Sequence, residues 1–451
     1  MERAIVIGAS AAGLLAARML ARHARDVVVL ERDALSLEGG PRRGIPQASH
    51  LHGLLTRGQR SLERYFPGIR DELVGRGAVL EDGNREVGWL GPYGFRPPLP
   101  GPGPSYLFAT RSLLDDVLVR RVRSTPEIRV RGGCPVRGLV LDDRRRARGV
   151  RIESGEVIEG ELVVDASGRG SSILRMLAAF DFDPPEETVV DAGYGYASAL
   201  LRTKRPFPNG WRSLFVLGTT EVPRGAMLAE VENGLVVSTF VATGDSTLPT
   251  RPAEVPDFAA SLRCDVVHEV VHDADFVSRL STNRSTSSRR LRFGPMGLPD
   301  GLVPIGDALA VFNPVYGQGI TVAGLEVEAL DERLASEEDP TVAAKKALAD
   351  FERIVDAVWS MTTAEDFRHR RTTGARPFGL RLVHAYLDRI HAASLRHPEV
   401  VRAFDRAANL EDFGGGLLEP RIAWRVLGTV PPPRPLERVE RPSAFVAGAH
   451  P

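Results

Sequence analysis

The stretch at residues 4–13 reads AIVIGASAAG, and it decides the expected fold of the chain. Its apolar start predicts a short buried strand that ends at Gly8, and the residues from Ala11 to His23 predict a helix. Residues 27–30, VVVL, predict a second buried strand, which Glu31 follows directly. A strand–helix–strand unit of about 30 residues predicts a parallel sheet in an α/β fold.

The turn between this first strand and the helix has the composition of a phosphate-binding turn. Gly8 permits a tight bend, Gly13 permits close packing of helix on strand, and Ser10 replaces the middle glycine of the usual fingerprint. Backbone N–H groups at the helix start would then face a pyrophosphate. Glu31 would accept hydrogen bonds from a ribose and repel a 2′-phosphate, which favours FAD or NAD over NADP. The candidate contacts in this unit are Gly8, Ser10, Ala11, Ala12, Gly13, Glu31 and Arg32.

Composition excludes several other classes of protein. The 58 basic side chains balance 58 acidic ones, so no overall field attracts nucleic acid or an anionic membrane. The two cysteines, Cys134 and Cys264, have no disulfide or zinc pattern, which favours a reducing cytoplasm. No apolar run reaches 18 residues, so we expect no membrane span.

Two later motifs also follow apolar strands. Residues 162–171, LVVDASGRGS, place Asp165 at the end of a strand, although a plain turn with a serine cap explains this stretch equally well. Gly306 and Asp307 end another strand, and residues 313–319, NPVYGQG, precede a helix from 320 to 335. A carboxylate there suits ribose or ribityl hydroxyls, and a helix N-terminus suits the negative charge of a reduced flavin. The candidate contacts are Asp165, Gly306, Asp307, Pro314, Gly317, Gln318, Gly319 and Ile320.

These three elements, in this order, resemble the FAD-dependent monooxygenases of the p-hydroxybenzoate hydroxylase superfamily. Residues 42–52, RRGIPQASHLH, together with NPVYGQG, resemble more narrowly the flavin epoxidases of polyether polyketide biosynthesis, the lasalocid and monensin type. The resemblance implies that Arg42 or Arg43 lies along the FAD and that Arg111 contacts it. Ala310 stands where many members of the superfamily have a histidine, which agrees with the epoxidase subgroup.

The change of pattern along the chain predicts how the domains are arranged. Short apolar runs at 192–202, 213–217, 226–231 and 235–242 predict an antiparallel sheet, and helical spacing returns at 342–361, 376–395 and 398–410. We expect a Rossmann-like FAD-binding domain from 1–75, 105–180 and 286–335, and a substrate-binding sheet domain from 76–104 and 181–285. A helical region at 336–430 and an extended tail at 431–451 complete the chain.

The resemblance also implies an activity. Reduced FAD would capture O2 as a C4a-hydroperoxide and insert one oxygen atom into a lipophilic natural-product intermediate, for example a polyketide-derived one, by epoxidation or hydroxylation. NAD(P)H would supply electrons, either directly or through a partner flavin reductase. An FAD-dependent dehydrogenase or a redox-neutral cyclase remains the alternative, and a binding module with vestigial FAD is a third reading.

Attack on an alkene needs no acid or base from the protein, and the sequence contains no convincing catalytic triad. His50 and His52 are weak catalytic candidates, because a third metal ligand is not evident and their spacing aligns them only in an extended segment. Aromatic residues of the expected sheet domain are candidates for the substrate pocket. They are Trp89, Tyr93, Phe95, Tyr194, Tyr196, Trp211, Phe215 and Phe240.

Overall fold

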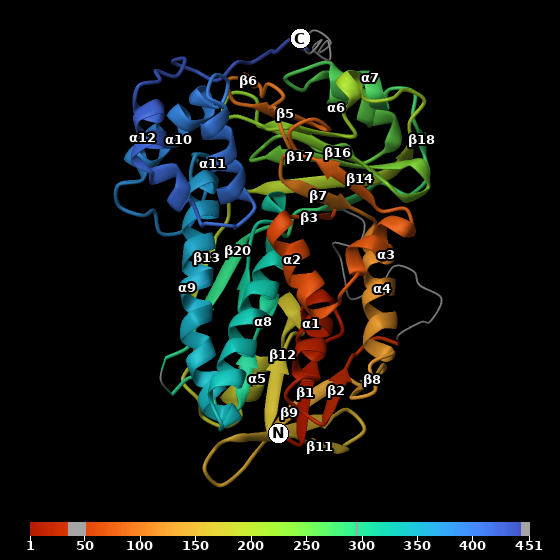
Figure 1. The fold of residues 1–451 in the computed structure, drawn as a ribbon, viewed down its shortest axis with the longest axis vertical. Helices are drawn as coiled ribbons and strands as arrows, with labels where there is room; N and C mark the ends of the chain where they lie inside the picture. The colour runs from red at the N-terminus through yellow and green to blue at the C-terminus, as the bar shows by residue number, and fades with distance from the viewer. Residues whose placement is uncertain (35–50, 295, 443–451) are drawn as a thin grey trace.

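A five-stranded parallel sheet forms the lower half of the molecule in Figure 1, a computed structural model that describes residues 1–34, 51–294 and 296–442. Its strand order is β21-β12-β1-β2-β8, and every neighbouring pair is parallel. The strands are β1 (Arg3–Ile7), β2 (Asp26–Leu30), β8 (Ile128–Arg131), β12 (Leu162–Asp165) and β21 (Leu302–Pro304). Parallel strands end at one common edge, so the turns after β1, β12 and β21 are neighbours.

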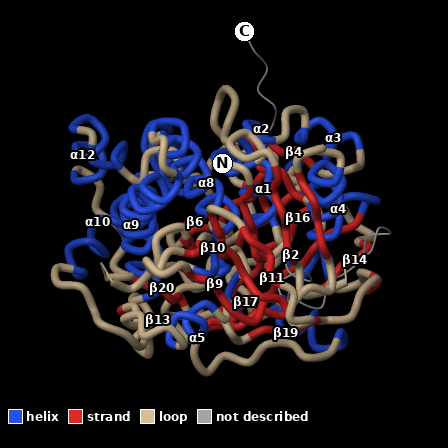
Figure 2. The backbone as a smooth tube through the Cα atoms, turned by 90° about the horizontal axis from the view of Figure 1, so that it is seen from below, coloured by secondary structure: helices blue, strands red, loops and turns tan. Residues whose placement is uncertain are grey.

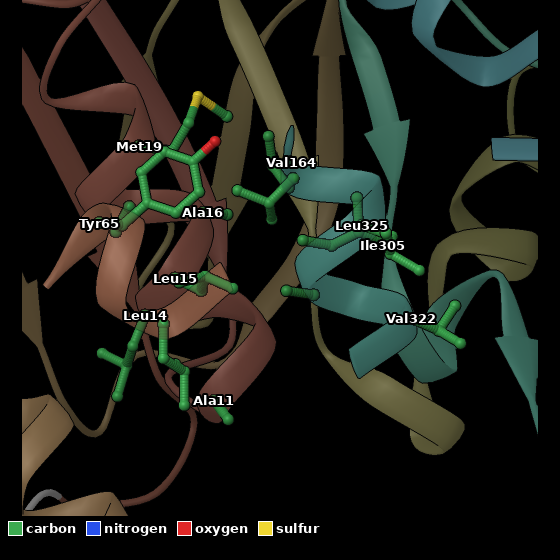
Figure 3. Packing of buried hydrophobic residues seen from close by; sticks show 14 of the residues in the cluster. Ala11, Leu14, Leu15, Ala16, Met19, Tyr65, Val164, Ile305, Val322 and Leu325 are labelled. Atoms are coloured by element: carbon green, nitrogen blue, oxygen red, sulfur yellow. The ribbon is translucent and has the colours of Figure 1, made fainter. Parts of the chain in front are cut away.

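Helices cover one face of this sheet. Side chains alternate along a strand, so Ala4 and Val6 of β1 face the helices while Ile5 and Ile7 face the opposite side. The covering helices include α1 (Ala11–Leu20), α4 (Arg111–Arg123), α8 (Gly319–Ser336) and α9 (Pro340–Asp366). Figure 3 shows apolar side chains of α1, α8 and the strands meeting in this core. The other face packs on α5 (Ile173–Ala178) and a sheet of β9 (Val136–Leu141), β10 (Ala147–Ile152) and β11 (Val157–Glu159).

A second, mainly antiparallel sheet occupies the upper half (Figure 1). Its order is β18-β14-β17-β16-β15-β5-β6, with β19 paired to β14, and β5 runs parallel to β15. The strands are β5 (Val87–Gly91), β6 (Gly94–Phe95), β14 (Tyr194–Arg202), β15 (Ser213–Val216), β16 (Arg224–Val231), β17 (Leu235–Thr243), β18 (Asp275–Phe276) and β19 (Ser281–Asn283). The four strands expected between 192 and 242 are therefore confirmed. Two short helices, α6 (Val255–Ala260) and α7 (Val266–Val271), contribute to the apolar core on one face of the sheet.

Smaller elements join the two sheets. Two further helices are α2 (Thr56–Tyr65) and α3 (Ile69–Gly75). One three-stranded sheet contains β3 (Gly53–Leu54), β4 (Val79–Asp82) and β7 (Ser105–Phe108). Another contains β13 (Glu186–Val190), β20 (Ser288–Arg292) and β22 (Ala310–Val311).

The C-terminal region is helical, as expected. Helix α9 runs along the molecule, and α10 (Leu380–Ala393), α11 (Pro398–Ala408) and α12 (Pro420–Leu427) gather beside the upper sheet (Figures 1 and 2). The chain after Gly428 lacks regular structure up to Pro442, and Val439 donates its N–H to the carbonyl of Arg263 in the sheet domain. None of the helices in the described ranges is long and apolar enough to cross a bilayer.

Candidate active site

The turn after β1 has the close backbone approach that the sequence predicts. Gly8 has a φ of +100°, and a Cβ placed on it would lie 2.5 Å from the carbonyl oxygen of Ala166 in the turn after β12. A Cβ on Gly13 would lie 2.0 Å from the carbonyl oxygen of Gly8. Both positions require glycine, because any side chain would force α1 away from the sheet edge.

The turn at Gly306 and Asp307 lies against this same edge. A Cβ on Gly306 would lie 3.3 Å from Cβ of Ala12 on α1 and 3.6 Å from Cβ of Ala323 on α8. Positions equivalent to Cβ on Gly168 and Gly319 lie 3.9 Å from the Asp307 side chain. The three motifs found separately in the sequence therefore meet at one place.

Two helix N-termini at this place lack side-chain caps. Ser10 and Gln318 occupy the N-cap positions of α1 and α8, and neither side chain bonds to the first-turn amides. Thr110 caps α4 and Asp339 caps α9, but most other described helices also start without a side-chain cap. The starts of α1 and α8 are distinguished by their place beside the glycine turns. Uncapped first-turn N–H groups carry partial positive charge and suit a phosphate or a flavin anion. This glycine-lined edge with two uncapped helix starts fits FAD.

The acidic side chains near this edge have different environments. Glu31 accepts the backbone N–H of Ala9 at 2.8 Å with one oxygen and that of Asp33 at 3.1 Å with the other. Asp165 is buried, and its two oxygens accept hydrogen bonds from Ser167 and Ser171, so it closes its own turn. The alternative of a serine helix cap is met only in part, because Ser172 at the N-cap of α5 makes no cap bond while the Ser171 hydroxyl oxygen accepts the N–H of Ile173 at 3.0 Å. Cofactor contact by Asp165 stays a prediction.

The arginines named from the sequence lie in two settings. The Arg32 guanidinium comes within 3.9 Å of a Cβ placed on Gly170, next to the central motif. Arg111 is buried at the first residue of α4 and pairs with Asp115 at 2.8 Å. The N-cap of α4 is Thr110, whose side chain accepts the N–H of Leu113. Arg42, Arg43 and His50 lie outside the described residues.

His52 lies in the described part of the chain. Within residues 1–34, 51–294 and 296–442, no cluster of three or more His, Cys, Asp or Glu side chains could hold a metal ion.

A large cavity adjoins the start of α8. Its volume is about 990 Å³, and it lies between the upper sheet, the helices α9 to α11 and the turn from Pro314 to Gln318. Three of the expected aromatic residues line it, namely Trp89, Tyr194 and Phe215. Seven further aromatic residues line its wall and are not among the substrate residues expected from the sequence, namely Tyr106, Phe108, Tyr316, Trp359, Phe367, Phe378 and Phe404.

The other five expected substrate residues are not among the described residues that line this cavity. Phe95 and Trp211 stack on each other with ring centroids 5.4 Å apart, in or against the core on the α6–α7 side. Phe240 is fully buried there and packs edge-on against Phe258. Tyr93 is buried, and the Tyr196 hydroxyl donates to Asn313. These five residues therefore do not line this cavity, and contact of any of them with a substrate stays a prediction.

A buried polar network joins the cavity wall to the turn before α8. Asp366 at the end of α9 accepts hydrogen bonds from the Tyr316 hydroxyl at 2.9 Å and from Asn313 Nδ2 at 3.1 Å. Burial raises the pKa of Asp366 to about 6. The sequence offers no signal for this network, because its members are about 50 residues apart and Asp366 belongs to an ordinary helix.

A second polar pair lies on the cavity wall. The Tyr194 hydroxyl lies 3.1 Å from His369 Nε2, and both residues line the cavity. Burial, and then the charge of Arg368, lowers the pKa of His369 to about 4, so this imidazole is neutral at physiological pH. A neutral imidazole beside a tyrosine can orient a polar group of a ligand by hydrogen bonding.

Two curated relatives match most of the chain, whereas no family model matches it. Protein Rv3254 of Mycobacterium tuberculosis is 29% identical over 441 residues, which cover 91% of this chain and 90% of that protein. The kynurenine 3-monooxygenase of Salinispora arenicola is 28% identical over 408 residues, which cover 82% of this chain and 81% of that enzyme.

Solved structures share the fold at lower identity. A flavoprotein/dehydrogenase from Cytophaga hutchinsonii has a TM-score of 0.66 at 16% identity, covering 93% of this chain and 96% of its own. PqsL, a probable FAD-dependent monooxygenase from Pseudomonas aeruginosa, has a TM-score of 0.58 at 16% identity, with 82% and 98% covered. The Diels–Alderase PyrE3 of pyrroindomycin biosynthesis has a TM-score of 0.60 at 17% identity, with 91% and 80% covered.

These likenesses establish the α/β fold with a helical C-terminal region. The chain shares its fold with flavoproteins, among them a probable FAD-dependent monooxygenase. The narrower resemblance to polyether epoxidases stays a prediction.

Proposed function

We propose that this chain is an FAD-dependent monooxygenase that inserts one oxygen atom from O2 into a lipophilic natural-product intermediate, by epoxidation or hydroxylation. One observation carries the proposal: the uncapped start of α8, which fits a flavin, borders the aromatic cavity of about 990 Å³. A cofactor at that edge and a ligand in that cavity would share the turn from Pro314 to Gln318. NAD(P)H, used directly or through a flavin reductase, is the proposed electron donor.

The roles of the residues follow from this arrangement. The amides at the starts of α1 and α8 bind the anionic parts of FAD, and Asp307 accepts hydrogen bonds from its polyol. When bound and reduced, FAD supplies the activation of O2. Trp89, Phe215 and the other aromatic residues of the cavity exclude water and hold an apolar ligand against the shared turn. Tyr194 and His369 orient a polar group of that ligand.

The proposal is tested by reducing the flavin. FAD-loaded protein is titrated without oxygen with NADH and then NADPH, alone and with polyene and phenolic ligands, while the absorbance band of oxidised flavin is followed. Bleaching that a ligand accelerates supports a self-sufficient monooxygenase. If neither nicotinamide bleaches bound FAD, an added flavin reductase distinguishes a two-component monooxygenase from a redox-neutral cyclase. Product formation without flavin turnover would overturn the proposal in favour of the cyclase.

A further inference from the structure

A carboxyl group lies beneath the turn that contains Gly306 and Asp307. Glu326 belongs to α8, and its side chain is fully buried, with 0% exposed. One of its oxygens, Oε2, accepts the backbone N–H of Gly306 at 2.6 Å. The other, Oε1, is buried and has no hydrogen-bond partner among the described residues. The group therefore holds the turn through one oxygen, while the other has no hydrogen-bond partner among the described residues.

Such an environment favours the neutral acid. Burial raises the pKa of Glu326 to about 8, the Gly306 N–H opposes this shift, and the charge of Asp307 adds to it. No cation among the described residues compensates a negative charge on Glu326. An ionised carboxylate with an unpaired buried oxygen is costly, so ionisation would disturb the turn that it holds.

The site above this turn is the proposed position of an anion. FAD carries a diphosphate, and the glycine-lined edge beside Ala12 and Asp307 is where the chain would hold it. Two negative groups close together disfavour each other's ionisation. Bound FAD would therefore make ionisation of Glu326 still less favourable than in the free protein.

We infer that neutral Glu326 is a positioning residue of the cofactor site and that FAD binding is coupled to proton retention at this carboxyl. The inference rests on the proposed FAD site. Because the complex holds the proton more firmly than the free protein, FAD affinity is unaffected at lower pH and falls as the pH rises above about 8. In that window the dissociation constant rises by up to about tenfold per pH unit.

The test measures FAD affinity, which needs no substrate. Full-length protein is stripped of FAD and titrated with FAD between about pH 7 and about pH 9.5, and the quenching of flavin fluorescence gives the dissociation constant. Glu326→Gln keeps an oxygen that accepts the Gly306 N–H, but it cannot ionise. The variant is expected to bind FAD as the wild type does near neutral pH and to lose the weakening at high pH.

Glu81 provides a matched control. It is also buried, accepts a hydrogen bond from the Ser213 hydroxyl, has a buried Oε1 without a partner among the described residues, and has a pKa raised by burial to about 8. Its neighbours Ser213 and Arg212 lie outside the turn at Gly306. Glu81→Gln is therefore expected to keep the wild-type dependence of FAD affinity on pH. Equal slopes for the wild type and Glu326→Gln would overturn the inference.

A measurement on the wild type does not depend on any variant. Calorimetric titration of FAD at about pH 8.5, in two buffers with different ionisation enthalpies, gives the number of protons taken up on binding. We expect a fractional uptake of protons, and FAD binding with no proton uptake would overturn the inference while leaving the proposed function intact. Absence of FAD binding at neutral pH would overturn both.

Discussion

Replacing Arg263 by methionine is expected to destabilise the protein by about 3–4 kcal/mol. The Arg263 side chain is fully buried, and its guanidinium donates to four backbone carbonyls. These are Leu436 at 2.7 Å, Gly91 at 3.0 Å, Leu217 at 3.1 Å and Pro92 at 2.7 Å. One side chain thus ties the C-terminal segment to the upper sheet.

The magnitude follows from the acceptors that the substitution leaves behind. Each buried carbonyl that loses its donor costs about 1–3 kcal/mol, and partial rehydration places the four near the lower end of that range. Removal of the buried cation offsets part of this cost, since burial lowers the pKa of Arg263 to about 10. Methionine keeps most of the apolar stem, so the loss of hydrogen bonds dominates.

Urea unfolding measures the free energy, and limited proteolysis measures release of the C-terminal segment. Arg441→Met is the matched control on the same segment. Arg441 pairs with Glu269 at the surface, where an ion pair contributes less than about 1 kcal/mol. If Arg263→Met unfolded within about 1 kcal/mol of the wild type, with an equally protected C-terminal segment, the reasoning would be refuted.

Three further predictions concern the site. Gly13→Ala would place a Cβ 2.0 Å from the Gly8 carbonyl oxygen, so we expect the purified protein to lose most of its FAD. The ratio of flavin absorbance to protein measures this loss. An unchanged ratio would contradict FAD binding at the turn between β1 and α1. The rings of Trp89 and Phe215 stack on the cavity wall with their centroids 5.5 Å apart. Replacing either residue by alanine should raise the KM for an apolar ligand about tenfold and leave the FAD content unchanged. An unaltered KM would show that the ligand binds elsewhere. Burial raises the pKa of Asp366 from its ordinary 3.8 to about 6 in the folded state. Because the folded state binds this proton more tightly than the unfolded state, the stability of the wild type falls as the pH rises from about 4 to about 6. In urea unfolding, Asp366→Asn should make the free energy of unfolding less dependent on pH over this range. The same pH dependence in the variant and the wild type would refute this prediction.

Much of the fold follows from local pattern in the sequence. The unit from Arg3 to Leu30 is predictable because a buried parallel strand reads as a continuous apolar run and glycine marks its turn. The strands of the upper sheet are predictable for a similar reason, since turns bound each apolar run. The meeting of the three motifs also follows, because parallel strands end at one edge.

The residues that line the cavity cannot be predicted from local pattern in the same way. Phe240 and Val241 are neighbours on β17, yet Val241 lines the cavity while Phe240 packs in the core with Phe258. Both faces of that strand are apolar, so the sequence does not show which face the ligand would meet. Tyr194 and Tyr196 share a face of β14, yet only Tyr194 lines the cavity, while the Tyr196 hydroxyl donates to Asn313.

Buried polar groups were missed for a different reason. Glu326 lies on α8, where Glu328 and Asp331 are buried as well, and Asp366 lies at the end of α9. Only tertiary packing buries these carboxyl groups. Arg263 likewise has no sequence signal, because its partners are backbone carbonyls from three distant segments. Long-range packing, which decides these environments, has no local signature in composition or spacing.

The most direct test of the proposed monooxygenase activity is to measure whether an oxygen atom from O2 enters the product. FAD-loaded protein is supplied with NADH or NADPH, with and without a flavin reductase, under oxygen-18 gas and with the panel of polyenes and phenols, and products are identified by mass spectrometry. The account predicts a product that carries one oxygen-18 atom from the gas and whose formation requires FAD. A product that forms with FAD bound but contains no oxygen from the gas would contradict it.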